Sequence, residues 1–288
     1  MASTRQIKSR IRSVKSNKQI TKAMELVAAS KLRRAQDATK ASSPYAMAAR
    51  ELLTQLGHKT DVRHNIFYDK RPVKTHLVVL ITSDRGLAGS FNANAIKQCI
   101  AILQADRKAG ITTTLLCVGK KGAQFAAKIE GVDIIGAYPA LPDHMSAADI
   151  RPILVAAVDQ YIDEHVDAVD IVTTKFVNSF TQVAVTIPLL PAVFETTDVS
   201  ADIRMSYFEP TLDEVLEGAT IRLLETQLYQ AILDARASEH SMRRVAMKNA
   251  TDNATDLVDD LTLEMNKVRQ SAITQELSEI SAGVEAMK

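Results

Sequence analysis

The sequence contains few of the residues that build compact aromatic cores. Among its 288 residues there is no tryptophan, and aromatic residues make up 5%, although hydrophobic residues reach 46%. The hydrophobic content is therefore mainly aliphatic, which suits helix–helix seams better than deep aromatic cores. Because no run of about eighteen uncharged hydrophobic residues occurs, the sequence predicts no transmembrane helix.

Cysteine is also scarce, with Cys99 and Cys117 as the only two. Both have hydrophobic neighbours and are expected to be reduced core residues of a cytoplasmic protein. The histidines are scattered and show no metal-ligand spacing, so we expect neither a metal site nor a bound cofactor.

Acidic residues are nearly missing from the start of the chain. Residues 5–34 carry ten lysines and arginines against Glu25 alone, whereas residues 252–285 carry eight acids against Lys267 and Arg269. The basic start has no hydrophobic signal segment, so we expect it to be the first helix of the mature protein. One end of the chain is cationic and the other anionic.

Glycine is absent from residues 4–56, and Pro44 is the one proline there. Hydrophobic residues recur at helical spacing, which predicts one long helix that bends at Pro44 and ends near Gly57. A polar connector follows over 57–75. The predicted apolar face of this helix comprises Ile7, Ile11, Val14, Ile20, Met24, Val27, Ala28, Leu32 and Ala35.

In the middle of the chain, segments with the residue pattern of strands alternate with segments that have the pattern of helices. Short β-rich runs at 76–82, 114–118, 132–136 and 170–176 are separated by helical stretches at about 93–108, 121–129 and 147–165. This alternation predicts a mostly parallel, Rossmann-like α/β domain with right-handed crossovers. The run QVAVTIPLLP is expected to form an edge strand.

From Pro210 onward the sequence has no further proline. Starting at Leu212, alternating steps of four and three reach residue 272, and most of these positions are hydrophobic. This is the seam of a coiled coil, interrupted by Thr226, Gln230, His240, Arg244 and Thr251, which we expect to be half-exposed or to fix the register. The predicted domains are therefore a helix over 1–57, a connector and globular domain over 58–209, and a helix over 210–288.

The two long helices leave the same domain and are expected to pair antiparallel, with opposing residue numbers that add up to about 267. Arg12 and Lys15 would then lie beside Asp252 and Asp256, so the charges of the two ends would match. In this register the start of the first helix lies opposite about residue 266 of the second helix. Beyond that point Ile273, Leu277, Ile280 and Val284 still repeat at helical spacing, which predicts another protein surface around this tip.

Evidence for catalysis is weak. SDRGLAGSFN (83–92) lies where a Rossmann fold binds phosphate but is not GxGxxG, so a tight turn capped by Asp84 or Ser83 is favoured. VGKKG (118–122) places lysines at a helix N-terminus, a generic anion site without P-loop spacing. No nucleophile–base pair stands at an informative spacing, and we expect no catalytic residue.

Three stretches together resemble the gamma subunits of rotary F-type ATP synthases, bacterial type. They are ITKAMELVAASKLRRAQ (20–36), SDRGLAGSFN (83–92), and RRVAMKNATDNATDL with NKVRQSAITQELSEI (243–257, 266–280). The chain departs from the family at four positions and lacks the segment with the regulatory cysteine pair of chloroplast members. Those positions are Ala88, often Cys; Ser90, often Gly; Arg244, usually Met; and Met265, usually Tyr.

The resemblance implies a non-catalytic rotor shaft that couples ion-driven rotation of a membrane ring to ATP synthesis or hydrolysis in a ring of alpha and beta subunits. The implied partners are those subunits, the epsilon subunit and the membrane rotor (c) ring, at the cytoplasmic face of a bacterial inner membrane. Arg269, Gln270, Thr274 and Met24 match positions that contact a beta subunit, and Glu209 matches a position near the rotor ring.

Two other functions fit parts of the sequence. A coiled coil that binds nucleic acid would explain the basic helix through phosphate contacts that weaken steeply with salt. A Rossmann-type enzyme would bind a dinucleotide through its α/β domain. The resemblance favours the rotor shaft, with no nucleic acid among its partners.

Overall fold

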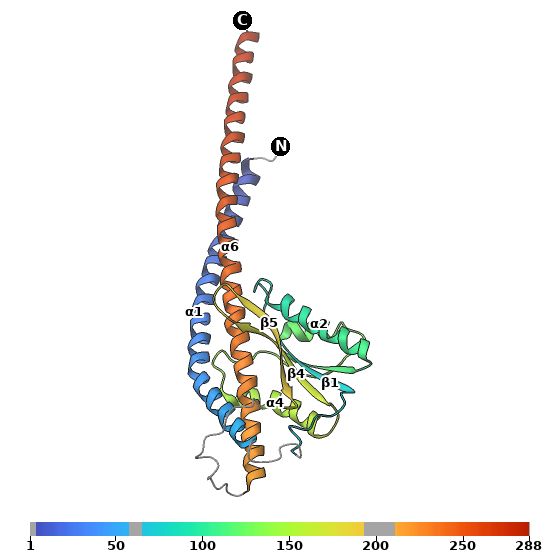
Figure 1. The fold of residues 1–288 in the computed structure, drawn as a ribbon. Helices are drawn as coiled ribbons and strands as arrows, with labels where there is room; N and C mark the ends of the chain where they lie inside the picture. The colour runs from blue at the N-terminus through green and yellow to red at the C-terminus, as the bar shows by residue number, and fades with distance from the viewer. Residues whose placement is uncertain (1–3, 58–64, 193–210, 288) are drawn as a thin grey trace. The chain divides into compact units, whose positions relative to one another are not determined.

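A computed structural model describes residues 4–57, 65–192 and 211–287 (Figure 1). The chain forms two compact units. The first combines Met1–Ala29 with Arg243–Lys288, and the second comprises Ser30–Met242. In the parts of the chain that are described, no helix is both long enough and hydrophobic enough to cross a membrane.

Two long helices run through both units. Helix α1 spans Thr4–Gly57 and continues across Pro44 without interruption, as the sequence predicts. Helix α6 spans Leu212–Ala286, a stretch with only two glycines and no proline. Glycine and proline are the residues least favourable to helix interiors, so their scarcity allows these lengths.

The second unit contains a five-stranded sheet in the order β3-β2-β1-β4-β5. The first four strands are parallel, and β5 is an antiparallel edge strand beside β4. The predicted α/β class with a mostly parallel sheet is confirmed. The strands are β1 (Thr75–Ile81), β2 (Thr112–Val118), β3 (Asp133–Tyr138), β4 (Ala168–Phe176) and β5 (Gln182–Leu190).

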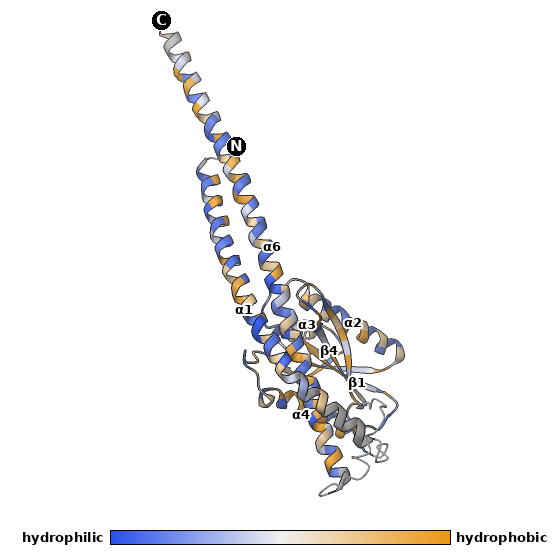
Figure 2. Ribbon diagram, turned by 60° about the vertical axis from the view of Figure 1, so that its left-hand side comes forward, coloured by the Kyte–Doolittle hydropathy of each residue, from blue (hydrophilic) through white to orange (hydrophobic). Residues whose placement is uncertain are grey.

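Helices cover both faces of this sheet. Successive side chains of a strand point to opposite faces, so the hydrophobic strands place hydrophobic side chains on both. Leu77 and Val79 of β1 point into a core shared with α4 (Ala147–Ile162) and α6. Val78 and Leu80 point the other way, into a core shared with α2 (Phe91–Ala109) and α3 (Lys120–Ala126). Figure 2 shows hydrophobic residues both in the strands of the sheet and on the helices around it.

In the second unit, α6 is enclosed on more than one side. Between Leu223 and Ser241 nearly every side chain is buried or half-buried. One face meets the sheet core, and Ala237 packs with Leu32 and Ala35 of α1. A helix that is buried around most of its circumference is a core element of its unit, not a surface helix.

In the first unit, the early part of α1 packs along the far part of α6. Ile7, Ile11 and Leu261 form a small core, with Val258 and Val268 at its border. The predicted apolar face is wrong at Ile20 and Val27, whose side chains are 55% and 56% exposed. The contact face instead runs through Lys18 and Thr21, which are half-buried, because steps of three and four from Val14 reach these polar residues.

The register of this pair differs from the predicted one. Thr251 Oγ1 donates a hydrogen bond to Thr21 Oγ1 (2.8 Å), whereas the predicted sum of 267 places Ala246 opposite Thr21. The helices are therefore offset by five residues. The polar seam position Thr251 is buried in this contact, as expected of a residue that fixes a register.

Candidate partner-binding surfaces

The far end of α6 exposes hydrophobic side chains on a single helix. From Arg269 to Gly283 every side chain is exposed, whereas Val268 is half-buried against the Ile7–Leu261 core. Ile273, Leu277 and Ile280 are 49%, 60% and 63% exposed. They lie on one side of the helix because their spacing is four and three residues. The side chain of Val284, the fourth predicted member, lies outside the described residues.

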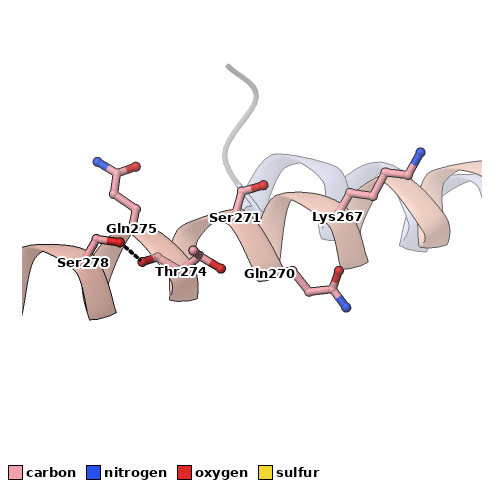
Figure 3. A pocket seen from close by; sticks show the side chains of 6 residues that line it. All are labelled: Lys267, Gln270, Ser271, Thr274, Gln275 and Ser278. Atoms are coloured by element: carbon pink, nitrogen blue, oxygen red, sulfur yellow. Dashed lines mark hydrogen bonds between the residues drawn. The ribbon is translucent and has the colours of Figure 1, made fainter.

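Next to this stripe the same helix carries a polar strip. It comprises Lys267, Gln270, Ser271, Thr274, Gln275 and Ser278 (Figure 3). Ser278 donates a hydrogen bond to the carbonyl oxygen of Thr274 (2.9 Å), and Gln275 bonds Glu279 (3.0 Å). The predicted contact residues Gln270 and Thr274 belong to this strip, and Arg269 is exposed beside it. The tip thus offers hydrophobic area together with hydrogen-bonding groups.

Helix α1 adds a second exposed surface in the first unit. Ile20, Leu26 and Val27 are 55%, 62% and 56% exposed. Met24, a predicted contact residue, is half-buried, and Glu25 forms an ion pair with Lys22 (2.9 Å). Exposed aliphatic side chains close together on a helix are typical of a protein-binding surface.

The predicted charge pairing does not take the form of direct contacts. Arg12, Lys15, Asp252 and Asp256 are all exposed, and no ion pair within 4.0 Å joins them in the described part of this unit. Exposed pairs of this kind contribute about 0.2–1 kcal/mol even when formed. Charge matching along these helices therefore stays a prediction, which a double-mutant cycle on Arg12 and Asp256 can test.

In the second unit, the loop after β1 lies where open α/β sheets bind ligands. The sheet order reverses at β1, between β2 and β4, and such switch points form crevices at the carboxyl ends of strands. Here the loop satisfies its own polar groups. Asn92 Oδ1 accepts hydrogen bonds from the backbone and the hydroxyl of Ser83 (both 3.0 Å), so this side chain, not flagged by the sequence, fixes the turn.

Asp84 lies at the N-terminus of α3, where the backbone N–H groups of a helix can bind an anion. Its carboxylate accepts hydrogen bonds from the backbone N–H of Lys120 (3.0 Å), at the start of α3, and of Ala140 (3.1 Å). Ser83 closes the turn as expected, since its hydroxyl donates to the carbonyl oxygen of Arg85 (2.7 Å), whereas Asp84 lies at the start of α3 and Ser90 occupies the N-cap position of α2. The donors that a dinucleotide phosphate would need at VGKKG are thus taken within the chain: the N–H of Lys120 by Asp84, that of Lys121 by the carbonyl oxygen of Ser83 and that of Gly122 by Thr82 Oγ1.

One predicted residue cannot be placed. Glu209, expected near the rotor ring, lies outside the described residues.

Comparison with known proteins identifies the family of the chain. The family model described as ATP synthase matches residues 3–287. The ATP synthase gamma chain of Opitutus terrae is 41% identical over 296 residues, covering 98% of both chains. The chain belongs to the ATP synthase gamma chain family.

Solved structures share the fold of this gamma chain family. A chain of the Euglena gracilis mitochondrial ATP synthase (OSCP/F1/c-ring, rotational state 3) superposes with a TM-score of 0.71 at 19% identity, covering 99% of this chain and 94% of that one. A chain from the central stalk and c-ring of the Tetrahymena thermophila enzyme gives a TM-score of 0.59 at 23% identity, covering 80% and 99%.

Three of the four departures from the gamma chain pattern fall at tolerant places. Ala88 is 2% exposed and packs in the sheet core, where a small side chain fits. Arg244 is exposed, so its charge stays in water although the seam pattern passes through it. Met265 is half-buried against the Ile7–Leu261 core, and a flexible thioether fills such irregular gaps.

Proposed function

We propose that this chain is the central rotor shaft of a rotary F-type ATP synthase. The observation that carries the proposal is the tip of α6, where fifteen consecutive residues, 269–283, are exposed although they include a hydrophobic stripe. A single amphipathic helix of this kind needs a surrounding protein surface, and the family membership indicates that this surface is a ring of alpha and beta subunits.

The mechanism needs no catalytic residue in this chain. A single helix with a hydrophobic stripe and a neighbouring polar strip presents a different face in each direction. Within a ring of alternating subunits, each catalytic site would therefore meet a different face and be stabilised in a different conformation. Rotation exchanges the faces, which couples rotation to changes in nucleotide affinity.

The proposal includes the remaining partners and the location. We expect contacts of Arg269, Gln270, Thr274 and Met24 with a beta subunit, and contacts of the second unit with the epsilon subunit and the membrane c-ring. The chain would then be a peripheral, non-catalytic subunit at the cytoplasmic face of a bacterial inner membrane, and ion transport, of hydrogen or sodium ions, would drive its rotation.

Purification of the complex from its native membrane tests this role. An affinity tag on this chain should recover one copy per three alpha and three beta subunits, together with epsilon and the c-ring. Recovery of the chain without alpha and beta subunits would contradict the proposal. The two other functions have their own signatures, which are salt-sensitive nucleic-acid binding and saturable binding of a dinucleotide.

The second unit gives a reason to expect no dinucleotide binding. The carboxylate of Asp84 occupies the backbone N–H of Lys120 at the start of α3. A phosphate would have to displace it and would meet its negative charge. Equilibrium dialysis of the full chain with NAD is therefore expected to show no saturable binding.

A further inference from the structure

A small cavity lies in the second unit between α1, the loop before α4, and α6. Its volume is about 130 Å³. Since one water molecule needs roughly 10–15 Å³ of space of this kind, the cavity has room for a small hydrated oxyanion. The lining includes Lys31, Arg34, Asp143, Tyr229, Arg236 and His240.

The walls of the cavity are held in place by three elements. Lys31 Nζ of α1 forms an ion pair with Asp143 Oδ2 in the loop (2.7 Å). Tyr229 OH of α6 donates to the carbonyl oxygen of Met145 (2.9 Å), and Arg236 Nη2 donates to that of Leu141 (2.7 Å). The loop is thus fastened from both helices, so this wall of the cavity needs little ordering on binding.

The lining carries an excess of positive charge. Lys31, Arg34 and Arg236 are cations, whereas Asp143 is the one carboxylate among the lining residues. Asp84 and Glu239, outside the lining, also act on Arg236, and the Lys31 contact holds the pKa of Asp143 below its usual value.

Arg34 is the cation with unused capacity. Its side chain is exposed at the cavity, and it has no ion-pair partner in the described parts of the chain. The other two cations are engaged, Lys31 with Asp143 and Arg236 with the carbonyl oxygens of Leu141 and Pro142. A guanidinium fork with free donors at a preformed cavity suits a tetrahedral oxyanion, which it binds through two parallel hydrogen bonds.

We propose that this cavity binds a phosphate group, with Arg34 and Lys31 as its main ligands. Asp143 competes with the phosphate for Lys31, so binding loosens that ion pair. The source could be free inorganic phosphate or the terminal phosphate of a nucleotide. None of the ligands belongs to the surfaces assigned to the alpha and beta subunits.

Calorimetric titration of the full-length chain with inorganic phosphate, at constant ionic strength, tests the site. Arg34→Gln should weaken binding about tenfold, as expected for the loss of a charge-assisted hydrogen bond. Arg33→Gln is the matched control, because Arg33 is exposed on the same helix next to Arg34 but does not line the cavity. Asp143→Asn should tighten binding, because it removes the competing carboxylate.

Thermal unfolding gives an independent readout, since a ligand that binds the folded state raises the unfolding temperature. Phosphate should raise it for the unmodified chain and Arg33→Gln, and less for Arg34→Gln. An arm with ADP identifies the source: binding of ADP without binding of free phosphate assigns the nucleotide. Absence of saturable binding by both, or equal weakening by Arg33→Gln and Arg34→Gln, would overturn the proposal.

Discussion

His76 lies between two carboxylates near the start of β1. Its Nδ1 is 2.7 Å from Asp106 Oδ2, and its Nε2 is 3.3 Å from Asp170 Oδ2. Thr113 Oγ1 also donates to Asp106 Oδ2 (2.8 Å), and the His76 side chain is only 9% exposed. Burial alone lowers the pKa of His76, but the hydrogen bonds and charges of Asp170 and Asp106 outweigh it, so the pKa is raised above 6.5.

This raised pKa predicts how stability depends on pH. The protonated imidazole is favoured in the folded state, so its contribution is fully present below about pH 6.5, the unfolded value, and is lost as pH rises through the folded pKa. His76→Gln should cost about 2 kcal/mol of unfolding free energy at pH 6 and less at pH 9, measured by urea denaturation. His165→Gln, at an exposed histidine, is the control. A cost for His76→Gln that is independent of pH would contradict the prediction.

Gly119 allows the close approach of two strand ends. Its φ is +94°, and a Cβ placed there would lie 2.1 Å from the carbonyl oxygen of Thr82. Gly119→Ala should therefore destabilise the second unit by about 3 kcal/mol or more, through strain and a backbone clash.

Gly110 is the matched control for this substitution, since its φ is +74° but nothing lies within 4 Å of a Cβ there. Gly110→Ala should lower the free energy of unfolding by only about 1–2 kcal/mol, because alanine is less stable than glycine in a left-handed conformation. Unfolding temperatures of the two variants provide the comparison. Equal losses would mean that the contact with Thr82 is not limiting.

Such residue contacts were only partly predictable from the sequence. The loop at 83–92 was correctly expected to be a turn, but Asp84 accepts hydrogen bonds from residues 120 and 140. These donors come from segments distant in the sequence and are brought together only by the packing of β2 and β3 beside β1. No local pattern distinguishes such an acceptor from a cap of its own helix.

At the scale of elements, the register of α1 and α6 in the first unit can be measured by cross-linking. The hydroxyls of Thr21 and Thr251 are in hydrogen-bonding contact, so the variant Thr21→Cys/Thr251→Cys should form a disulfide under mild oxidation. The pair Thr21→Cys/Ala246→Cys represents the register expected from the sequence and should not, since five residues along a helix span about 7.5 Å.

The two native cysteines should not interfere with this experiment. Burial raises the pKa of Cys99 to about 12 and that of Cys117 to about 11, so little reactive thiolate forms at neutral pH. Electrophoresis without reductant measures the cross-link. Efficient cross-linking of the 21/246 pair and none of the 21/251 pair would show that the register in solution is the one with the sum of 267.

Elements could be predicted far better than their contact faces. The strand expected at 114–118 is observed as Thr112–Val118, and the helix at 93–108 as Phe91–Ala109, since hydrophobic runs and turn residues mark them locally. The hydrophobic pattern predicts the wrong contact face at Ile20 and Val27. A hydrophobic pattern can locate a helix–helix contact face only where that face consists of hydrophobic residues. Here the contact face of α1 includes the polar residues Lys18 and Thr21.

At the scale of the whole molecule, folding and function place different demands on α6. Between Leu223 and Ser241 the helix is buried and holds the second unit together, so substitutions there are expected to act through stability. From Arg269 onward no side chain through Gly283 is buried, so this stretch contributes little to stability. We expect its hydrophobic residues to bind a partner.

Deletion of the chain from Arg269 onward separates these two demands. Far-ultraviolet circular dichroism and the unfolding temperature should change little, because Val268 and the Ile7–Leu261 core remain. Reconstituted with alpha and beta subunits, the truncated chain should turn under ATP hydrolysis with lower torque, measured from the rotation speed of a viscous load. A shorter deletion from Ser281 onward is the control, since it keeps Arg269, Gln270, Thr274 and the hydrophobic stripe through Ile280, and it should retain more torque. Full torque after the longer deletion would mean that the tip of α6 does not transmit force to the ring.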